Sequence, residues 1–280
     1  QAKKHTNTNE VIQKYFDSIF IDQMGGQISL GNPPKRIISL VPSQTELLYE
    51  LGAGDLLVGR TKFCVHPKPD VLKLPVVGGT KTPDLQRIIK LNPDLIIGNK
   101  EENEQISIEE IKRHFPVWMS DIENFNQSID MIMMLGSLLV CEENVSTLVE
   151  QILVAKDELQ TFVGAKFGNH KPEVIYMIWK NPYMAAGTNT FINEMLGFCG
   201  LKNLAGGRYP EFSNEQLYAL NPELIFLSSE PYPFKNKHVS EIKEICPDAR
   251  IVLVDGEMFS WYGSRMKAAF PYFKQLLQTL

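Results

Sequence analysis

The sequence lacks an excess of positive charge. Its 28 Lys and Arg residues stand against 33 Asp and Glu residues, which gives a formal net charge of −5 at pH 7, and no stretch is rich in Lys or Arg. A protein that binds nucleic acid needs a basic surface to neutralise phosphates. The composition therefore excludes nucleic acid as an expected partner, while the hydrophobic content of 44% is that of an ordinary globular protein.

Cysteine is also scarce, and its four copies are scattered at Cys64, Cys141, Cys199 and Cys246. They form no CxxC pair and have no His at metal-ligand spacing, so the sequence predicts neither a zinc site nor a redox motif. Free, buried thiols are the favoured interpretation, because free cysteine packs as a small hydrophobe. A disulfide stays open as the alternative, because spacing alone does not fix pairing.

Long apolar runs are missing too. No stretch approaches the roughly 18 apolar residues of a membrane span, and no signal-peptide core is visible. Residues 1–10 are polar and aperiodic, and the chain begins at Gln1. This start favours the linker of an exported or lipid-anchored protein, in the periplasm or at the cell envelope, with a cloning remnant or a cytoplasmic location as alternatives.

What the sequence does contain is an internal repeat. Residues 85–97 read LQRIIKLNPDLII, and residues 214–226 read NEQLYALNPELIF. In each copy a helical pattern stops at Asn-Pro, because the residue before proline leaves the α region and proline has no N–H to continue the helix. The pattern DxExF also occurs twice, at 121–125 and 255–259. The repeat predicts two α/β lobes.

The elements around each repeat support this organisation. Strands are expected at 37–41 and 174–179, followed by helices, the first opened by a Ser43-x-x-Glu46 capping box and ended by Gly52. Alternating strands and helices indicate parallel sheets, whose ligands lie beyond the carboxyl ends of the strands. We expect a cleft between the lobes there.

The predicted domain organisation has four parts. An N-terminal tail and short β segment with a turn at Gly25-Gly26 cover 1–33, and an N-terminal α/β lobe covers 34–125. An apolar, proline-free helical pattern at 126–168 predicts an interlobe helix, with a second interpretation in which residues 141–144 break it in two. The C-terminal α/β lobe covers 169–280.

No catalytic motif is present. Residues 54–61 resemble a phosphate-binding loop but have Arg60 in place of Lys and an apolar interior, so we interpret them as a turn that enters a strand. Ser43 lies in no GxSxG elbow. The sequence therefore predicts a protein that is not an enzyme and has no catalytic residues.

The strongest signal is a resemblance. Residues 36–47 (RIISLVPSQTEL), the two LNP[DE]LI steps, the interlobe helical pattern and residues 260–265 (SWYGSR) resemble the helical-backbone (class III) substrate-binding proteins of ABC importers. That family carries cobalamin, haem and ferric siderophores, and the resemblance is closest to the cobalamin-binding members. It implies two Rossmann-like α/β lobes with parallel sheets, bridged by a long helix.

The resemblance also implies a function. The chain would capture a metal chelate (a cobalamin-like corrinoid, haem or a ferric siderophore) in the interlobe cleft, as a monomer without an intrinsic cofactor. It would then dock on an ABC permease through one acidic residue per lobe. The matching positions are Glu215 and Gln86, and the second of these is neutral.

Aromatic side chains crowd the predicted loop ends, where flat faces suit a planar ligand, and core packing is the alternative for each of them. The candidate ligand-binding residues are Ser43, Phe63, His66, Lys81, Trp179, Tyr183, Met184, Glu230, Glu257, Phe259, Trp261 and Arg265. Among them, His66 is a candidate axial ligand to a bound metal, and otherwise no metal ligand is predicted. Arg265 would meet ligand acids or pair with Asp255 or Glu257. Thr80 stands where the cobalamin-binding pattern has a tryptophan.

A rival interpretation keeps the same scaffold and changes the function. An intracellular enzyme or sensor that handles a metallocofactor could be built on duplicated lobes, because fold does not fix function. The neutral Gln86 favours this rival.

Overall fold

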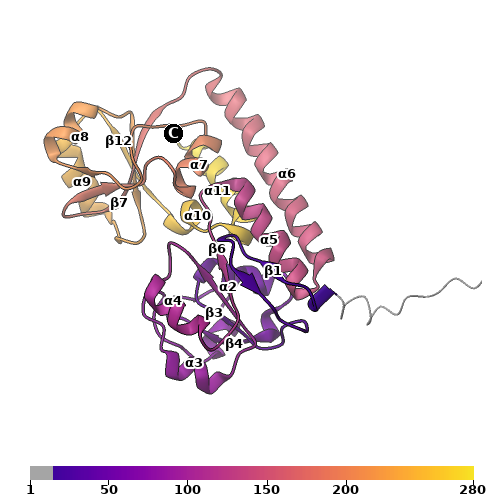
Figure 1. The fold of residues 1–280 in the computed structure, drawn as a ribbon. Helices are drawn as coiled ribbons and strands as arrows, with labels where there is room; N and C mark the ends of the chain where they lie inside the picture. Colours follow the sequence, from indigo (N-terminus) through magenta and orange to yellow (C-terminus); the bar gives the residue numbers. More distant parts are fainter. Residues whose placement is uncertain (1–14) are drawn as a thin grey trace, which may run out of the picture. The chain divides into compact units, whose positions relative to one another are not determined.

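The computed structural model describes residues 15–280, so the predicted polar linker at 1–10 lies outside the described residues. The chain divides by its internal contacts into two units (Figure 1). Unit 1 comprises Gln1–Asp121 and Ile129–Leu148, and unit 2 comprises Ile122–Ser128 and Val149–Leu280. Each unit has its own sheet and its own apolar core.

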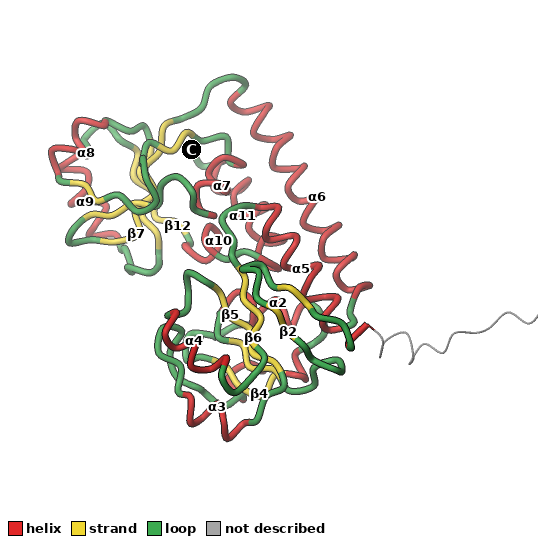
Figure 2. Tube along the Cα trace, viewed as in Figure 1, coloured by secondary structure: helices red, strands yellow, loops and turns green. Residues whose placement is uncertain are grey.

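Unit 1 is built on a four-stranded parallel sheet of order β4-β3-β5-β6 (Figure 2). The strands are β3 (Ile37–Ser39), β4 (Leu57–Arg60), β5 (Leu95–Asn99) and β6 (Val117–Ser120). The helices are α2 (Pro42–Glu50), α3 (Leu85–Leu91) and α4 (Gln105–Lys112), with 3₁₀ turns η1 (Gly54–Leu56) and η2 (Asp70–Lys73). All residues of β3, β5 and β6 are buried, as expected of a parallel sheet covered on both faces.

An N-terminal hairpin is attached to the edge of this sheet. Its strands β1 (Phe20–Ile21) and β2 (Gln27–Ile28) pair antiparallel, and Gly25 has a φ of 79° in the turn, so the predicted β segment and turn are confirmed. The backbone of Met119 in β6 donates to Asp22 Oδ2 (3.1 Å) and accepts from the Gln23 N–H (3.1 Å). The hairpin thereby pairs part of the edge strand β6.

Unit 2 repeats the pattern of unit 1 and adds to it. Its sheet has the order β10-β8-β7-β11-β12, with β9 also paired to β7. The strands are β7 (Glu173–Trp179), β8 (Tyr183–Ala185), β9 (Lys202–Asn203), β10 (Glu211–Phe212), β11 (Leu224–Ser228) and β12 (Arg250–Val254). The helices are α7 (Phe191–Phe198), α8 (Asn214–Leu220), α9 (Asn236–Ile245), α10 (Gly256–Ser260) and α11 (Met266–Gln278), with the 3₁₀ turn η3 (Gly263–Arg265). Strands β9, β7, β11 and β12 are parallel, and β8 and β10 form the antiparallel addition.

The repeat is visible at the level of single hydrogen bonds. Helices α3 and α8 both end at an Asn in the left-handed conformation, Asn92 and Asn221, each with a φ of 45°. The acid that follows the proline then ties its strand to a neighbour: Asp94 accepts from the N–H groups of Lys35 and Arg36 (2.8 and 3.0 Å). In unit 2, Glu223 accepts from the Glu173 N–H (3.0 Å). Both LNP steps therefore end a helix and position the central strands.

Two helices connect the units, α5 (Phe125–Leu139) and α6 (Glu142–Phe167). Of the two interpretations that the sequence left open, the broken connection is the one observed. Val140 has a φ of 55°, and the Cys141 N–H donates to the Gly136 carbonyl (3.0 Å), which is the bond of a Schellman helix end. Met133, which belongs to the apolar helical pattern predicted at 126–168, is exposed.

Two further expectations are settled. The predicted Ser43 capping box is wrong, because α2 begins at Pro42 with Val41 as its N-cap, two residues before the predicted N-cap, and has no side-chain cap, as proline at the first helical position allows. The four cysteines are free. Burial raises the pKa of each thiol, to about 11 for Cys141, the least buried of them.

Among residues 15–280, no helix is both long enough and apolar enough to span a bilayer.

Candidate ligand-binding site

The carboxyl end of β11 holds a half-buried carboxylate. Ser228, the last residue of this strand, donates its hydroxyl to the Glu230 carbonyl (2.6 Å). Glu230 Oε1 in turn accepts from the Ser260 hydroxyl (2.8 Å) and from the Trp261 indole N–H (3.1 Å). Burial raises the pKa of Glu230, and these two hydrogen bonds lower it only in part. A partly desolvated carboxylate of this kind gains from a cation or a donor brought to it by a ligand.

Arg265, in η3, is linked to this carboxylate through Trp261. Its guanidinium forms an ion pair with Glu257 (3.3 Å) and lies 4.8 Å from the centre of the Trp261 ring. The Arg265 side chain is only 12% exposed. Pairing with Glu257, one of the two alternatives for Arg265, is therefore observed, and the guanidinium is held in place by both partners. We call Glu230, Glu257, Ser260, Trp261 and Arg265 the Glu230 cluster.

An aromatic group lies at the carboxyl end of β7. Trp179, the last residue of that strand, is 42% exposed and lies edge-on to Tyr232, with 5.7 Å between ring centres. The neighbouring Lys180 forms an ion pair with Glu241 of α9. Tyr183 begins β8 and is half-buried, and burial raises the pKa of its hydroxyl. Trp179 therefore ends the parallel strand β7, Tyr183 and Tyr232 follow β7 and β11 in the chain, and Met184 follows Tyr183 in β8, half-buried.

Phe259 is placed differently from the other aromatic candidates. Its side chain has no exposed surface, and its ring lies 4.4 Å from that of Phe273 and 5.0 Å from that of Tyr176. Core packing, the alternative for every aromatic candidate, is what the structure shows for Phe259. Trp261, two residues further on, is 8% exposed and donates its indole N–H to Glu230.

In unit 1 the candidate residues other than Ser43 lie in the segment after β4. Phe63 is 53% exposed, with the Lys62 ammonium 4.9 Å from its ring centre. His66 is half-buried and precedes a cis proline. Lys81 is exposed and donates to the Glu101 carbonyl at the carboxyl end of β5. The structure thus brings Lys81 to the strand ends, and it presents Phe63 to solvent.

Sequence reasoning missed a buried polar network below these loops. Asn99, the last residue of β5, donates to Ser120 Oγ (2.9 Å), which also accepts from the Gln44 amide. The side chain of Asn99 accepts the Glu101 N–H (2.9 Å), just as Ser228 accepts the Glu230 N–H (3.3 Å). The internal repeat contained a sequence signal for this arrangement, because a polar residue ends the equivalent strand in both copies: Asn99 in β5 and Ser228 in β11. Ser43 itself is buried in α2.

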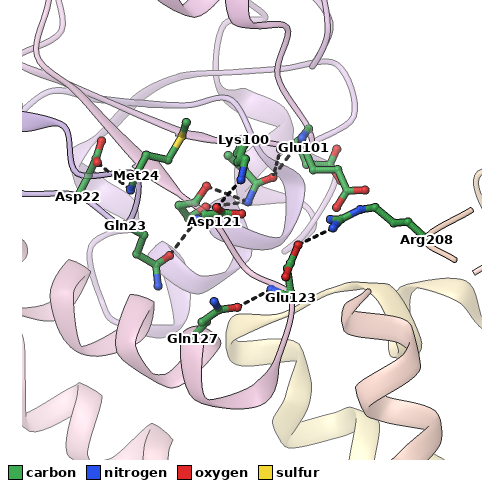
Figure 3. Close-up of polar contacts among 12 residues, drawn as sticks. Asp22, Gln23, Met24, Lys100, Glu101, Asp121, Glu123, Gln127 and Arg208 are labelled. Atoms are coloured by element: carbon green, nitrogen blue, oxygen red, sulfur yellow. Dashed lines mark hydrogen bonds and ion pairs between the residues drawn. The ribbon is translucent and has the colours of Figure 1, made fainter. Parts of the chain in front are cut away.

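The segment that follows β6 is held by polar side chains on both sides of Ile122 (Figure 3). Asp121 forms an ion pair with Lys100 (2.6 Å), and its N–H donates to Gln23 Oε1 (3.2 Å), all within unit 1. Glu123 pairs with Arg208, and its N–H donates to Gln127 Oε1 (2.7 Å), all within unit 2. Both acids of the first DxExF pattern therefore have structural partners.

Among the described residues, no group of three or more His, Cys, Asp or Glu side chains could hold a metal ion. What the strand ends offer is aromatic surface, a carboxylate, and a guanidinium fixed by ion pairing. This donor set can bind and orient a large ligand with acidic and apolar parts.

Comparison with known proteins establishes the family to which the chain belongs. The model of the family described as "Periplasmic binding protein" matches residues 37–244, well over half of the chain. The chain belongs to this family. Its members are binding proteins rather than enzymes.

Several known proteins can be compared with this chain directly. It is 28% identical to the uncharacterized ABC transporter substrate-binding lipoprotein YvrC of Bacillus subtilis, over 74% of this chain and 68% of that one. It is 26% identical to a vitamin B12-binding protein of Vibrio parahaemolyticus, over 75% and 77%. The structure of the periplasmic heme-binding protein RhuT from Roseiflexus superposes with a TM-score of 0.76 at 20% identity, covering 88% and 98%. These findings confirm the predicted fold class of two α/β lobes with parallel sheets.

The two predicted docking residues occupy equivalent positions in the two copies of the repeat. Glu215 lies in the first turn of α8, exposed, and a hydrogen bond with Ser213 lowers the pKa of its carboxyl. Gln86 lies in the first turn of α3, also exposed. The helix start favours a negative charge at either position, and Glu215 supplies one.

Proposed function

We propose that this chain is the solute-binding component of an ABC-type importer and that it captures a metal chelate. The observation that carries the proposal is the exposed Trp179 at the carboxyl end of β7, edge-on to Tyr232 and beside the Lys180–Glu241 ion pair. A large indole face left partly open at the end of a parallel strand is a ready surface for a flat or aryl-bearing ligand.

Three ligand classes fit this surface: a cobalamin-like corrinoid, haem and a ferric siderophore. Relatives named for vitamin B12 and for heme support the first two. Thr80 is buried and accepts from the Asn103 amide through its carbonyl (2.9 Å), so no large side chain stands at the position of the missing tryptophan. In unit 2, the acids of haem or of a siderophore would meet the Arg265 guanidinium, and the ring would lie against Trp179. Unit 1 offers groups of the same two kinds, Lys81 and Phe63.

The proposal includes a location and a partner. A solute-binding protein of an importer works at the cell envelope, and Glu215 would meet a basic side chain of the permease. Because Gln86 is neutral, the permease contact of α3 would rely on hydrogen bonds and shape. Replacement of Glu215 by Gln should then reduce uptake of the ligand more than capture of the ligand.

The test is a ligand panel. The purified chain is mixed in turn with cyanocobalamin, haem, and ferric siderophores of the hydroxamate and catecholate types, and absorption spectra and thermal unfolding are recorded. One class should shift the spectrum and raise the Tm, because a ligand that binds only the folded state stabilises it. For that ligand, Trp179→Ala should raise the Kd about tenfold, the scale of one aromatic contact with its buried area.

Tyr218→Ala is the matched control, because Tyr218 is an exposed aromatic residue of α8, away from the strand ends. It should leave the Kd unchanged. If no ligand of the panel shifts either the spectrum or the Tm, the proposal is wrong. Equal losses for Trp179→Ala and Tyr218→Ala would show that the ligand binds somewhere else.

A further inference from the structure

Glu101 and Glu230 occupy equivalent positions in the two copies of the repeat, each two residues after the polar residue that ends β5 or β11. In both copies that polar side chain accepts the N–H of the acid, at 2.9 Å in unit 1 and 3.3 Å in unit 2. The surroundings of the two carboxyl groups differ, because Glu101 is exposed whereas Glu230 is half-buried. Removing a carboxylate from water costs free energy, so unit 2 bears a cost at Glu230 that unit 1 does not bear at Glu101.

The backbone and side chain of Glu230 are held in one place by contacts within unit 2. Ser228 Oγ donates to the Glu230 carbonyl (2.6 Å) and accepts from the hydroxyl of the fully buried Tyr176 (3.1 Å). Gly256, at the start of α10, leaves room for the side chain, since a Cβ there would lie 2.6 Å from Glu230 Cγ, closer than carbon atoms pack. A ligand group that binds this carboxylate therefore finds it preorganised.

The two oxygens of the Glu230 carboxylate have different surroundings. Oε1 accepts from the Ser260 hydroxyl (2.8 Å) and from the Trp261 indole N–H (3.1 Å). Oε2 accepts no hydrogen bond from residues 15–280, and it is not one of their fully buried atoms. An ionised carboxylate only accepts hydrogen bonds, and each of its oxygens can accept more than one. Oε2 is therefore open to a donor that a ligand brings.

The charge around Glu230 also disfavours an acidic ligand group. Burial raises the pKa of Glu230, and the nearby carboxylates of Glu257 and Asp255 raise it further. The positive charge of Arg265 is already paired with Glu257 (3.3 Å). Residues 228–230 and 255–265 thus contain three acids and one basic residue. A cation or an N–H donor is attracted to such a surface, and an anion is repelled from it.

We propose that Glu230 is a specificity-determining residue of the ligand site, and that its Oε2 accepts a hydrogen bond from an N–H group on the rim of the chelate. The ligand is then a chelate with amide or ammonium donors, such as the carboxamides of a corrinoid or the free amine of a hydroxamate siderophore. Haem, whose rim carries carboxylates, and ferric catecholates, which are anions, are disfavoured. This proposal rests on the proposed function, because Glu230 selects only among ligands that the chain binds.

The test uses pairs of ligands that differ in one donor group. Cyanocobalamin is compared with the monocarboxylic acids made by hydrolysing one peripheral carboxamide at a time. Ferrioxamine B is compared with its trimethylammonium derivative, which keeps the charge and lacks the N–H donors. The Kd of each is measured by titration. For the chelate that the chain binds, the donor-bearing member should bind about tenfold more tightly or better, the scale of a hydrogen bond to a charged group.

Glu230→Gln should abolish this preference. The Gln carbonyl can still accept from Ser260 and Trp261, while its NH₂ group takes the position of Oε2 and cannot accept a donor. The Tm of the unliganded variant should be no lower than that of the unchanged chain, because a partly desolvated charge has been removed. Glu244→Gln is the matched control and should keep the preference, since Glu244 is an exposed acid of α9, close in the chain to the amino end of β12.

The outcomes separate this proposal from the proposed function. Equal affinity of the unchanged chain for both members of each pair would overturn the role of Glu230 and leave the proposed function standing. Tightest binding of haem or of a ferric catecholate would do the same. If Glu230→Gln lowers the Tm and weakens both members of a pair equally, Glu230 only supports residues 260–261, and the proposal is wrong. Absence of binding by every chelate would overturn both.

Discussion

His238 is buried at the start of α9, where its ring holds the backbone. Nδ1 accepts the Lys235 N–H (2.8 Å), and Nε2 lies 3.2 Å from the Tyr232 hydroxyl. Because Nδ1 is an acceptor, the neutral ring carries its hydrogen on Nε2 and donates to Tyr232. Burial, and then the charge of Lys180, keep the pKa of His238 below 6.5, against the opposing effect of Glu241.

This environment predicts a loss of stability in mild acid. The folded state resists protonation of His238 while the unfolded state does not, so the free energy of unfolding should fall as the pH drops below about 6.5 and level off below the folded pKa. His238→Gln removes the titration and keeps an acceptor for the Lys235 N–H, as Gln does in a capping box. Urea unfolding between pH 5 and pH 7.5 should therefore give a shallower pH dependence for the variant. Parallel curves would contradict this assignment.

Single residues were the hardest part of the site to predict from the sequence. The aromatic candidates could be chosen because they follow strands, but burial separates Trp179, which is exposed, from Phe259, which fills the core. Trp179 ends a strand and Phe259 lies in the helix after one, and the rings of Phe273 and Tyr176 around Phe259 place it in the core. A sequence does not show such contacts between distant segments.

Element boundaries followed the chemistry of the helix ends. The LNP steps were predicted correctly, and the structure adds that Asn92 and Asn221 leave the α region for the left-handed one, which Asn tolerates. The start of α2 was missed, since Pro42 and Ser43 both suit a helix start and only the proline is at the observed first position. When two residues that both suit a helix start lie within two positions of each other, either of them can begin the helix, and packing decides which one does.

The backbone is strained at the break between α5 and α6, and the loss of stability that this causes can be measured. Val140 has a φ of 55°, which a β-branched residue rarely adopts, and its side chain is exposed. Val140→Gly should raise the free energy of unfolding by about 1 kcal/mol, because glycine adopts this conformation without a steric penalty. Urea unfolding at neutral pH is the measurement.

The control for this prediction is the same substitution inside a helix. Val154 is an exposed residue of α6, and Val154→Gly should lower the free energy of unfolding by about 0.5 kcal/mol, the difference in helix propensity. Opposite signs for the two variants would locate the effect in the backbone conformation of Val140. Losses of similar size at both positions would mean that the left-handed conformation is not strained there.

At the scale of the whole molecule, duplication explains why so much of the fold could be predicted. Each unit has the same order of strand, helix and strand around a buried parallel sheet, so recognising the pattern in one unit also predicted it in the other. The additions to one copy, such as β8 and β10 in unit 2, had no counterpart to reveal them. Two complete cores also raise the question of whether the chain unfolds in one step.

Helix α6 gives a physical reason to expect one step. It passes without a break from unit 1, which includes Leu148, to unit 2, which includes Val149, so its hydrogen bonds are shared by both. Calorimetry should show a single transition for the unchanged chain. Glu150→Pro, at an exposed position beside this boundary, costs about 3 kcal/mol of helix and should split the transition in two, whereas Glu150→Ala should not. A single transition that merely moves to lower temperature in Glu150→Pro would show that the units are coupled by something other than the continuity of α6.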